Sequence, residues 1–238
     1  MRQVPPCYLI LGSGRMARHM AHYFDLLDLP YHRFARKTHD FSELPQLLQK
    51  TTHVLILLRD DAIEAFITAH LTECSHTLVH FSGSLATPFA YGAHFLVSFS
   101  QTLQPLETYQ QAWFVLDAED KSLNELLPGL PNQSITIPRE AKALYHSLCV
   151  LSGNFTCMLW QKFYDSLQQN WQIPKPAADM YLKLIMTNIL ADPKQALTGP
   201  LVRNDQKTIA ANLQALTDDP FQQVYHAFVS AYQQQESK

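Results

Sequence analysis

The chain has 238 residues, of which 47% are hydrophobic and 16% are charged, with a formal net charge of −3. This apolar content excludes a disordered chain. The first apolar stretch, Cys7–Leu11, is too short for a secretion signal, and the longest run, Val54–Leu58, is too short to span a membrane. Four scattered cysteines without a CxxC pair or a metal-ligand spacing then indicate a cytoplasmic protein with no metal site.

Charge differs between the two parts of the chain. Residues 1–137 carry 9 Lys and Arg against 13 Asp and Glu, a net of −4, and residues 138–238 carry 9 against 8, a net of +1. Neither part has the basic surface that nucleic-acid binding requires. We therefore expect no nucleic-acid partner, and the short apolar runs predict no membrane partner.

The first 137 residues alternate short apolar runs with stretches of helical spacing, which is typical of an α/β fold with a mostly parallel sheet and helices on both faces. Cys7–Leu11 is nearly all apolar, as a strand covered on both faces should be. Apolar residues then recur at helical spacing over Arg15–Leu27. The other expected elements are strands at Tyr31–Ala35, Val54–Leu58, Thr77–Phe81, Phe95–Phe99, Trp113–Asp117 and Ile135–Ile137, and a helix at Asp61–Leu71.

After Pro138 the pattern becomes purely helical. Proline suits the first turn of a helix, and Arg139–Trp171 contains no further proline and keeps helical spacing. Three more helices are expected at Pro174–Leu190, Asp205–Leu216 and Phe221–Gln234. The sequence thus predicts two domains, a nucleotide-binding α/β domain at residues 1–137 and an all-α domain for substrate binding and dimerisation at residues 138–238.

The most informative motif is Gly12–Ala17, which has the form GxGxxA and joins the first strand to its helix. Gly12 permits the tight turn, Gly14 lets a pyrophosphate approach the backbone, and Ala17 lets the helix pack closely on the strand. Free N–H groups at the helix N-terminus favour the phosphates. The motif predicts a Rossmann-like dinucleotide site, against the alternative of a purely structural turn. The residues expected at the phosphates are Gly12, Ser13, Gly14, Arg15 and Met16.

The end of the second strand indicates which dinucleotide is bound. An NAD enzyme usually has an acid there to hold the ribose hydroxyls. This chain has Arg36 and Lys37 instead, with no acid until Asp40. Arg36 can stack on adenine and pair with a 2′-phosphate, and Lys37 adds charge. We predict NADP rather than NAD, the alternative being two solvated loop cations.

Further cofactor contacts are expected where other strands end, because ligands of open α/β sheets bind outside the carboxyl ends of the strands. Leu58, Arg59 and Asp60 would pass beside the adenosine ribose. Ser82 and the backbone of Gly83 would contact ribose or nicotinamide. His80, just before them, is either part of this site or a half-buried histidine with satisfied hydrogen bonds.

The long helix after Pro138 contains a glycine that needs a reason. Gly153 costs about 1 kcal/mol relative to alanine in a helix interior. At helical spacing His146 lies above it, and Ser147 lies above Asn154. One interpretation is a helix–helix contact through the small residue. The other places nicotinamide or substrate against Asn154, with His146 as the proton donor near neutral pH.

Three segments carry a resemblance to a known family. They are Leu78-Val-His-Phe-Ser-Gly-Ser84, Leu144-Tyr-His-Ser-Leu-Cys-Val-Leu-Ser-Gly-Asn154 and Ala196-Leu-Thr-Gly-Pro-Leu-Val-Arg-Asn-Asp205. The chain resembles a family of NADP oxidoreductases in which a Rossmann-like domain precedes a helical domain of unknown function. That family is similar to pyrroline-5-carboxylate reductase and to 6-phosphogluconate dehydrogenase-type enzymes. The resemblance implies a homodimer formed through the helical domain, with the active site between domains, and it names no substrate.

The chain departs from that family at two points. Ser98-Phe-Ser-Gln-Thr102 stands where the family commonly has His-Pro-Leu-Gln, so no histidine acts there. Asn204 replaces the glycine of an Arg-Gly-Asp element, which is a mild change because asparagine tolerates left-handed backbone. In the resembled site Arg203 would clamp a substrate carboxylate, in a loop that ends at Thr208. A salt bridge from Arg203 to Asp205 or to a dimer partner is the alternative, and Asp205 fits a helix N-cap.

The function hypothesis is an NADP(H)-dependent oxidoreductase that transfers a hydride between nicotinamide and a small C=N or C=O substrate. His146, Asn154 and Arg203 are its candidate catalytic residues. An imine is favoured, because the dehydrogenase resemblance would put a lysine where Val150 stands, and a carbonyl would then need another proton donor. The alternative is a non-catalytic NADP-binding sensor or regulatory dimer.

Overall fold

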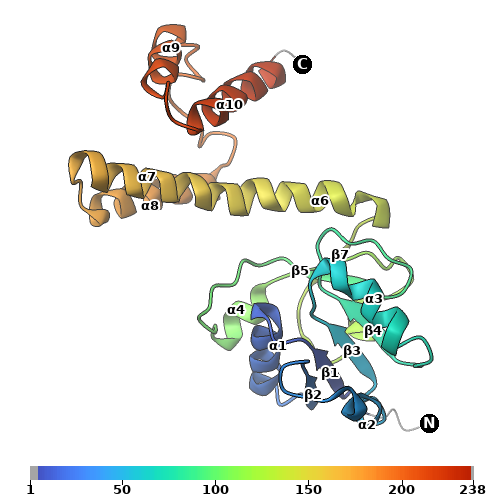
Figure 1. Cartoon of the computed structure of the whole chain (residues 1–238). Helices are drawn as coiled ribbons and strands as arrows, with labels where there is room; N and C mark the ends of the chain where they lie inside the picture. Colours follow the sequence, from blue (N-terminus) through green and yellow to red (C-terminus); the bar gives the residue numbers. More distant parts are fainter. Residues whose placement is uncertain (1–4, 237–238) are drawn as a thin grey trace. The chain divides into compact units, whose positions relative to one another are not determined.

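The computed structural model describes residues 5–236 (Figure 1). The chain divides into two compact units, residues 1–158 and 159–238. The first contains the sheet, its helices and the start of the long helix, and the second is entirely helical. Within residues 5–236, no helix is both long enough and apolar enough to cross a membrane.

The first unit is built on a seven-stranded sheet with the order β2-β1-β3-β4-β5-β6-β7. The neighbouring strands from β2 to β5 pair in parallel, β6 is antiparallel to β5, and β7 is parallel to β6. This is the predicted Rossmann-like, mostly parallel sheet. The strands are β1 (Tyr8–Leu11), β2 (Tyr31–Phe34), β3 (His53–Ile56), β4 (Thr77–His80), β5 (Tyr91–Phe95), β6 (Phe114–Leu116) and β7 (Ser134–Thr136).

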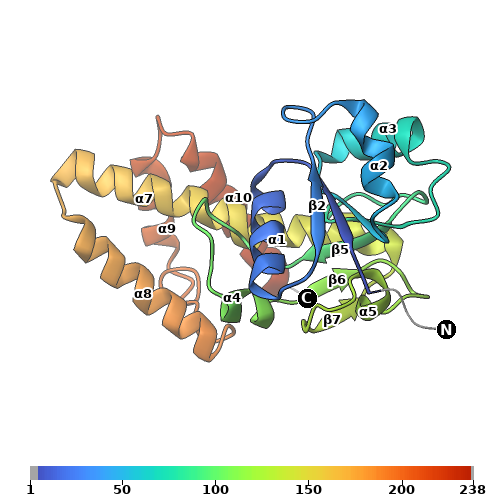
Figure 2. The ribbon, with the colours of Figure 1, turned by 90° about the horizontal axis from the view of Figure 1, so that it is seen from below.

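Helices cover the sheet on both faces, and Figure 2 shows α1 on one side of β1 and β2 with α2 and α3 on the other. The elements of the first unit are α1 (Arg15–Leu26), η1 (Phe41–Glu43), α2 (Leu44–Leu48), α3 (Asp60–His70), α4 (Leu106–Gln111), α5 (Leu123–Leu126), η2 (Arg139–Ala141) and α6 (Lys142–Cys149). A π-helical segment, η3 (Val150–Phe155), joins α6 to α7 (Thr156–Trp171).

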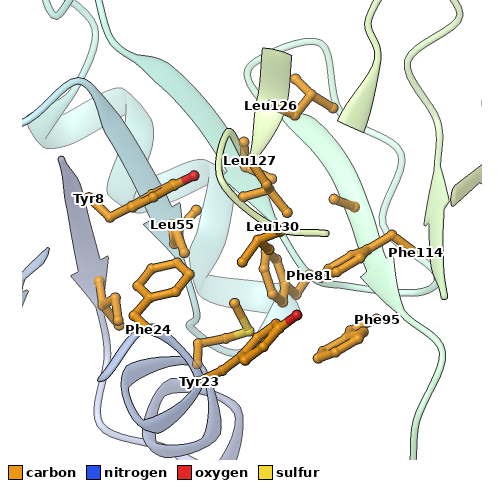
Figure 3. Packing of buried hydrophobic residues seen from close by; sticks show 14 of the residues in the cluster. Tyr8, Tyr23, Phe24, Leu55, Phe81, Phe95, Phe114, Leu126, Leu127 and Leu130 are labelled. Atoms are coloured by element: carbon orange, nitrogen blue, oxygen red, sulfur yellow. The ribbon is translucent and has the colours of Figure 1, made fainter. Parts of the chain in front are cut away.

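Alternation of side chains along the strands produces two cores, because successive residues of a strand point to opposite faces. Tyr8 and Ile10 belong to the core that includes Phe24 of α1, and Figure 3 shows its aromatic residues packed together. Leu9 and Leu11 belong to the other core, with Ile63 of α3. All four residues of β1 are fully buried, as its apolar sequence predicts.

The fifth strand was predicted in the wrong place. Sequence periodicity puts it at Phe95–Phe99, whereas β5 spans Tyr91–Phe95. Glycine has a weak strand propensity, so Gly92 makes residues 91–95 look less like a strand in the sequence. The other predicted strands agree with the structure to within two residues at either end.

The second unit consists of most of α7 and three further helices, with very little core of its own. Its helices are α8 (Lys175–Ala191), α9 (Gln206–Ala215) and α10 (Phe221–Glu236). Among the described residues of this unit, the only buried apolar side chains are Ala178, Ile209 and Val229. The predicted domain boundary at 137/138 matches the change from strand to helix, but the first compact unit extends to Met158. The two-domain division stays a prediction.

Candidate functional site

The turn between β1 and α1 contains two glycines with different structural reasons. Gly12 has φ +125°, which favours glycine, and a Cβ there would collide with the Leu57 carbonyl oxygen. Its N–H donates to the Phe34 carbonyl at 2.9 Å, which ties the turn to β2. Gly14 is the N-cap of α1, and a Cβ there would meet nothing within 4 Å. The chain itself therefore requires Gly12, whereas Gly14 leaves room for a ligand.

A cleft of about 790 Å³ lies over this turn, along the carboxyl ends of β1, β2 and β3. It collects more than half of the residues predicted to bind the cofactor. The predicted residues that line it are Gly12, Ser13, Gly14, Arg36, Lys37, Leu58 and Arg59.

Five other predicted cofactor residues do not line this cleft: Arg15, Met16, Asp60, Ser82 and Gly83. Arg15 donates to the Phe99 carbonyl oxygen at 3.0 Å, and Met16 packs against a core cluster. Their side chains are therefore engaged by the fold, and only their backbone positions belong to the start of α1.

The cationic side chains of the cleft differ in how they are used. Arg59 is exposed but pairs with Asp61, which also lines the cleft, so these two charges offset each other. Arg36 and Lys37 are exposed in the turn after β2 and form no ion pair with any residue in 5–236. The charge free to meet an anion is therefore that of Arg36 and Lys37.

Asp60 and Ser82 meet between the ends of β3 and β4. Asp60, in the first turn of α3, accepts hydrogen bonds from the hydroxyls of Ser82 at 2.6 Å and Ser84 at 3.1 Å. The Ser82 hydroxyl oxygen in turn accepts the Leu85 N–H at 2.9 Å. The carboxylate thus orders the loop that follows β4, in addition to any contact it makes with a ligand.

His80 is fully buried, and the structure leaves one of its nitrogens without a partner. Its Nδ1 accepts the Ser82 N–H at 3.3 Å, so the neutral ring carries its proton on Nε2. Nε2 is buried and has no hydrogen-bond partner among the described residues. Burial lowers the pKa of His80 to about 4, with Lys142 as the next cause. The structural interpretation expected a half-buried histidine with satisfied hydrogen bonds. His80 is instead fully buried, and its Nε2 lacks a hydrogen-bond partner among the described residues.

The structure brings the predicted residues Gly83 and His146 together, and adds two that sequence reasoning missed. A Cβ on Gly83 would lie 2.5 Å from Cδ2 of His146 and 3.1 Å from Cδ2 of His94. His94 Nδ1 lies 2.7 Å from the Tyr145 hydroxyl. Burial lowers the pKa of His94 to about 4, with His146 as the next cause, and burial raises the pKa of Tyr145. The absence of a side chain at Gly83 thus lets the two imidazole rings of His94 and His146 approach its backbone.

A buried ion pair beside this cluster was also missed. Lys142 Nζ lies 2.8 Å from Asp117 Oδ2, with side chains only 3% and 1% exposed. Asp117 Oδ1 accepts the Gly92 N–H at 2.6 Å, and a Cβ on Gly92 would collide with both charged groups. Burial lowers the pKa of Lys142, although Asp117 acts in the opposite direction. The ion pair thus links the first turn of α6 to the end of β6, and the hydrogen bond from Gly92 links both to β5.

Strand register explains why these groups meet. β5 begins where β4 ends, since His80 pairs with Gly92. Because β6 runs antiparallel to β5, its carboxyl end, and with it Asp117, comes to the same edge of the sheet as the carboxyl end of β4. A correct position for β5 in the sequence would have put His94 on a strand beside His80.

The remaining candidate residues lie on the helices. Asn154 is exposed within the π-helical segment η3, and a Cβ on the neighbouring Gly153 would meet nothing within 4 Å. Within the described part of the chain, therefore, no helix packs closely on Gly153. The i→i+5 bonding of η3 also changes the α-helical register that was assumed between His146 and Gly153.

Arg203 lies in the second unit, in the loop before α9. It is exposed and forms no ion pair with any described residue. Asp205 is the predicted N-cap of α9 and accepts the Thr208 N–H at 3.0 Å. Asn204 has φ +50°, the left-handed conformation that the replaced glycine would favour. The catalytic roles of His146, Asn154 and Arg203 stay predictions. Within residues 5–236, no group of three His, Cys, Asp or Glu side chains is arranged to hold a metal.

Comparisons with solved structures show the same fold over nearly the whole chain. A protein from Bacteroides fragilis assigned as an NADP oxidoreductase has a TM-score of 0.71 and 20% identity, covering 96% of this chain and 98% of that one. A reductive aminase from Aspergillus terreus in complex with NADPH and ethyl levulinate has a TM-score of 0.65 and 14% identity, covering 97% and 93%. Pyrroline carboxylate reductase from Plasmodium falciparum with NADP bound has a TM-score of 0.59 and 12% identity, covering 95% and 96%.

The sequence itself matches one family model. No curated protein matches the chain. The model of a domain of unknown function, DUF2520, matches residues 113–232, which is more than half of the chain and includes β6, the Asp117–Lys142 pair and the helices that follow. The chain therefore belongs to the family defined by the domain of unknown function DUF2520.

Proposed function

We propose that the protein is an NADP(H)-dependent oxidoreductase that transfers a hydride between nicotinamide and a small molecule with a C=N or C=O bond. The cleft over the β1–α1 turn carries the proposal, because it combines a helix N-terminus with two unpaired cations at the end of β2. Two of the similar structures hold NADPH or NADP.

The residues of the cleft fit a 2′-phosphorylated dinucleotide. The open space over Gly14 lets a phosphate reach the free N–H groups of α1. Arg36 offers the planar fork that pairs with phosphate oxygens. Asp40, the first acid after β2, instead accepts the Ser42 N–H at 2.8 Å and caps η1. The end of β2 therefore lacks the acid that would hold the ribose hydroxyls of NAD.

NADPH, when bound, supplies the hydride. The chain orients the reactants and moves the proton: we assign the proton donor to His146, which contacts Gly83, and a positioning role at the reactants to Asn154. Arg203 is assigned to a substrate carboxylate. We favour an imine over a carbonyl substrate because Val150 stands where a dehydrogenase would have lysine, and an imine protonated in solution needs less help.

The test has two arms on the full-length protein. NADPH should raise the melting temperature more than NADH does, and Arg36→Glu should abolish that preference. Loss of NADPH absorbance with a panel of cyclic imines and keto acids should then reveal turnover, which Asn154→Ala should reduce. Stabilisation without turnover on any compound would instead support a sensor. Greater stabilisation by NADH, or Arg36→Glu with unchanged NADPH affinity, would refute the cofactor assignment.

The two glycines of the turn should respond differently to substitution. Gly12→Ala should lower the free energy of unfolding by about 1–3 kcal/mol, because it adds backbone strain and meets the Leu57 carbonyl. Gly14→Asp should leave stability within about 0.5 kcal/mol, because aspartate is a good N-cap. It should weaken NADPH about tenfold or more through charge repulsion. Urea denaturation and calorimetric titration measure both, and equal NADPH affinity in Gly14→Asp would contradict the phosphate site.

We further propose that the protein is a homodimer formed through its helical part. Five exposed apolar residues follow the long helix at alternating spacings of four and three: Leu144 (66% exposed), Leu148 (56%), Leu151 (54%), Phe155 (45%) and Met158 (54%). In an α-helix this is the spacing of a seam between helices, and the π-helical segment η3, which contains Leu151 and Phe155, shifts its register. The second unit adds exposed Trp171, Tyr181 and Leu190 to its very small core. Apolar surface on this scale is typical of an interface.

Charges on that seam should separate the dimer. The wild-type protein is expected at twice its chain mass of 27.2 kDa, and the double variant Leu148→Glu, Leu151→Glu at 27.2 kDa, because both side chains are exposed in the single chain. Phe89→Glu, at an apolar residue of similar exposure (50%) outside the seam, is the matched control and should stay dimeric. Light scattering after size exclusion measures the mass, and a monomeric wild type would refute the proposal.

A further inference from the structure

His94 and His146 present the same edge of their rings to one point over Gly83. A Cβ on Gly83 would lie 2.5 Å from Cδ2 of His146 and 3.2 Å from Nε2 of His94. Because Cδ2 is bonded to Nε2 in an imidazole, the Nε2 edges of both rings border that point. The rings are nearly perpendicular, with centroids 6.2 Å apart and an interplanar angle of 89°. Two side chains from different elements, β5 and α6, therefore converge at one place.

This place lies beyond the carboxyl end of β4. β5 runs parallel to β4, and its Gly92 pairs with His80, the last residue of β4, so His94 lies two residues further along. Ligands of open α/β sheets bind outside the carboxyl ends of the strands. His94 and His146 are both half-buried, in contrast to the fully buried His80. Both rings can therefore meet a ligand at this edge of the sheet.

Tyr145 determines which nitrogen of His94 carries the proton. Its hydroxyl lies 2.7 Å from Nδ1, and this is the only hydrogen bond of the His94 ring within residues 5–236. A phenol hydroxyl is a stronger donor than a neutral imidazole N–H, so Tyr145 donates and Nδ1 accepts. His94 is neutral at pH 7, because burial lowers its pKa to about 4. The neutral ring then carries its proton on Nε2, at the Gly83 edge.

The charged groups around the two rings are already paired. Lys142 and Asp117 bind each other, and Asp60 accepts hydrogen bonds from two serine hydroxyls. No carboxylate of residues 5–236 forms an ion pair or a hydrogen bond with His94 or His146. Both imidazoles are therefore free to donate to a ligand.

We propose that His94 is a catalytic residue for carbonyl substrates, which donates Nε2–H to the C=O oxygen while His146 gives that oxygen its proton; this assignment rests on the proposed function. A carbonyl oxygen has two lone pairs and can accept from both rings. An imine that is protonated in solution has no lone pair left on its nitrogen. The N–H of His94 therefore assists the reduction of C=O and contributes little to the reduction of C=N.

Carbonyl reduction at this site is a two-electron step. The carbonyl carbon accepts the hydride, and the electron pair of the C=O π bond moves to the oxygen. The hydrogen bond from His94 stabilises the negative charge that develops there, as the donors of an oxyanion hole do. The oxygen takes the proton of protonated His146, which regains one from water, so the products are an alcohol and NADP⁺. His94 keeps its own proton throughout.

Two substrate panels separate the role of His94 from that of the rest of the site. On the full-length protein, loss of NADPH absorbance gives kcat/KM for cyclic imines and for cyclic ketones and keto acids of matching size. His94→Asn keeps an acceptor for the Tyr145 hydroxyl and removes Nε2–H. It should lower kcat/KM for carbonyl compounds by about 100- to 1,000-fold, the effect of removing one oxyanion donor, and that for imines far less. The carbonyl-to-imine ratio therefore falls.

Tyr145→Phe is the second variant, because it keeps the edge contact with the His94 ring and leaves the position of the His94 proton unfixed. It should lower the same ratio by a smaller factor. His22→Asn is the matched control, at a half-buried histidine of α1 that lies 3.2 Å from the Gln104 carbonyl oxygen, and it should leave the ratio unchanged. A rise in melting temperature with NADPH shows that each variant is folded.

An unchanged ratio in folded His94→Asn refutes the assignment, as do equal losses on both panels. If His94→Asn does not fold, Tyr145→Phe decides in its place. Turnover of imines but of no carbonyl compound by the wild type also refutes the assignment and leaves the proposed function standing. With carbonyl turnover alone, the same loss in His94→Asn at unchanged NADPH affinity supports the assignment. A wild type that reduces neither panel refutes the proposed function together with it.

Discussion

Replacing Lys142 by alanine is expected to lower the free energy of unfolding by about 3–5 kcal/mol, because removing one partner of a buried ion pair leaves an uncompensated charge. Among the described residues, the Asp117 carboxylate would keep only the Gly92 N–H as a partner, in a site where its side chain is 1% exposed. Domains of this kind are stable by only about 5–15 kcal/mol, so the loss is a large share of the total. Urea denaturation followed by circular dichroism measures it.

Two controls show whether the effect comes from the unpaired buried charge. The double variant Lys142→Met, Asp117→Asn removes both charges and keeps an acceptor for the Gly92 N–H, so it should recover much of the lost stability. Lys121→Ala breaks the exposed pair with Glu125 and should change the urea midpoint far less than Lys142→Ala does. A Lys142→Ala protein with the wild-type midpoint would show that the pair does not form in solution.

The protein should lose stability as the pH falls from about 6.5 toward 4, where histidines that fold in the neutral form must take up protons. Burial lowers the pKa of both His80 and His94 from 6.5 to about 4. Each therefore stabilises the fold fully above pH 6.5, and that contribution disappears by pH 4. A shift of this size corresponds to roughly 3 kcal/mol for the fully buried His80. Lys142 and Arg139 add to its shift, and Asp117 and Asp60 oppose it.

Asparagine at position 80 provides the test, because its amide oxygen can accept the Ser82 N–H in place of Nδ1. Urea midpoints measured between about pH 5 and 7 should fall with decreasing pH in the wild type. They should fall less steeply in His80→Asn, and least in the variant that also carries His94→Asn. Parallel pH profiles for all three proteins would mean that neither histidine folds in its neutral form.

Local sequence was sufficient for the nucleotide half of the sheet. β1 and β3 are apolar runs because both faces are covered, and the turn glycines have a direct backbone reason at Gly12. The cations of the cleft were also predictable, since Arg36 and Lys37 replace an expected acid. In each case the residues that allow the prediction lie within the predicted element or directly beside it.

The cluster of Gly83, His94, Tyr145 and His146 could not be predicted in the same way, because the residues that bring it together are distant in the chain. Gly92 reads as a strand breaker in the sequence, but Asp117, 25 residues further along, and Lys142, 25 residues beyond Asp117, fill the space that its side chain would need. His94 thereby fell outside the predicted strand Phe95–Phe99 and was not among the candidate site residues. The π-helical bonding of η3 likewise leaves no mark in the hydrophobic spacing of the long helix.

The Gly92–Asp117–Lys142 arrangement also has a consequence for sequence variation among relatives. A side chain at position 92 would need the space of both charged groups, and neither charge is tolerable alone in the interior. Single substitutions at these three positions should therefore be purged, whereas joint replacement by apolar residues remains open. In an alignment of the family, the three positions are expected to vary as a set rather than one by one.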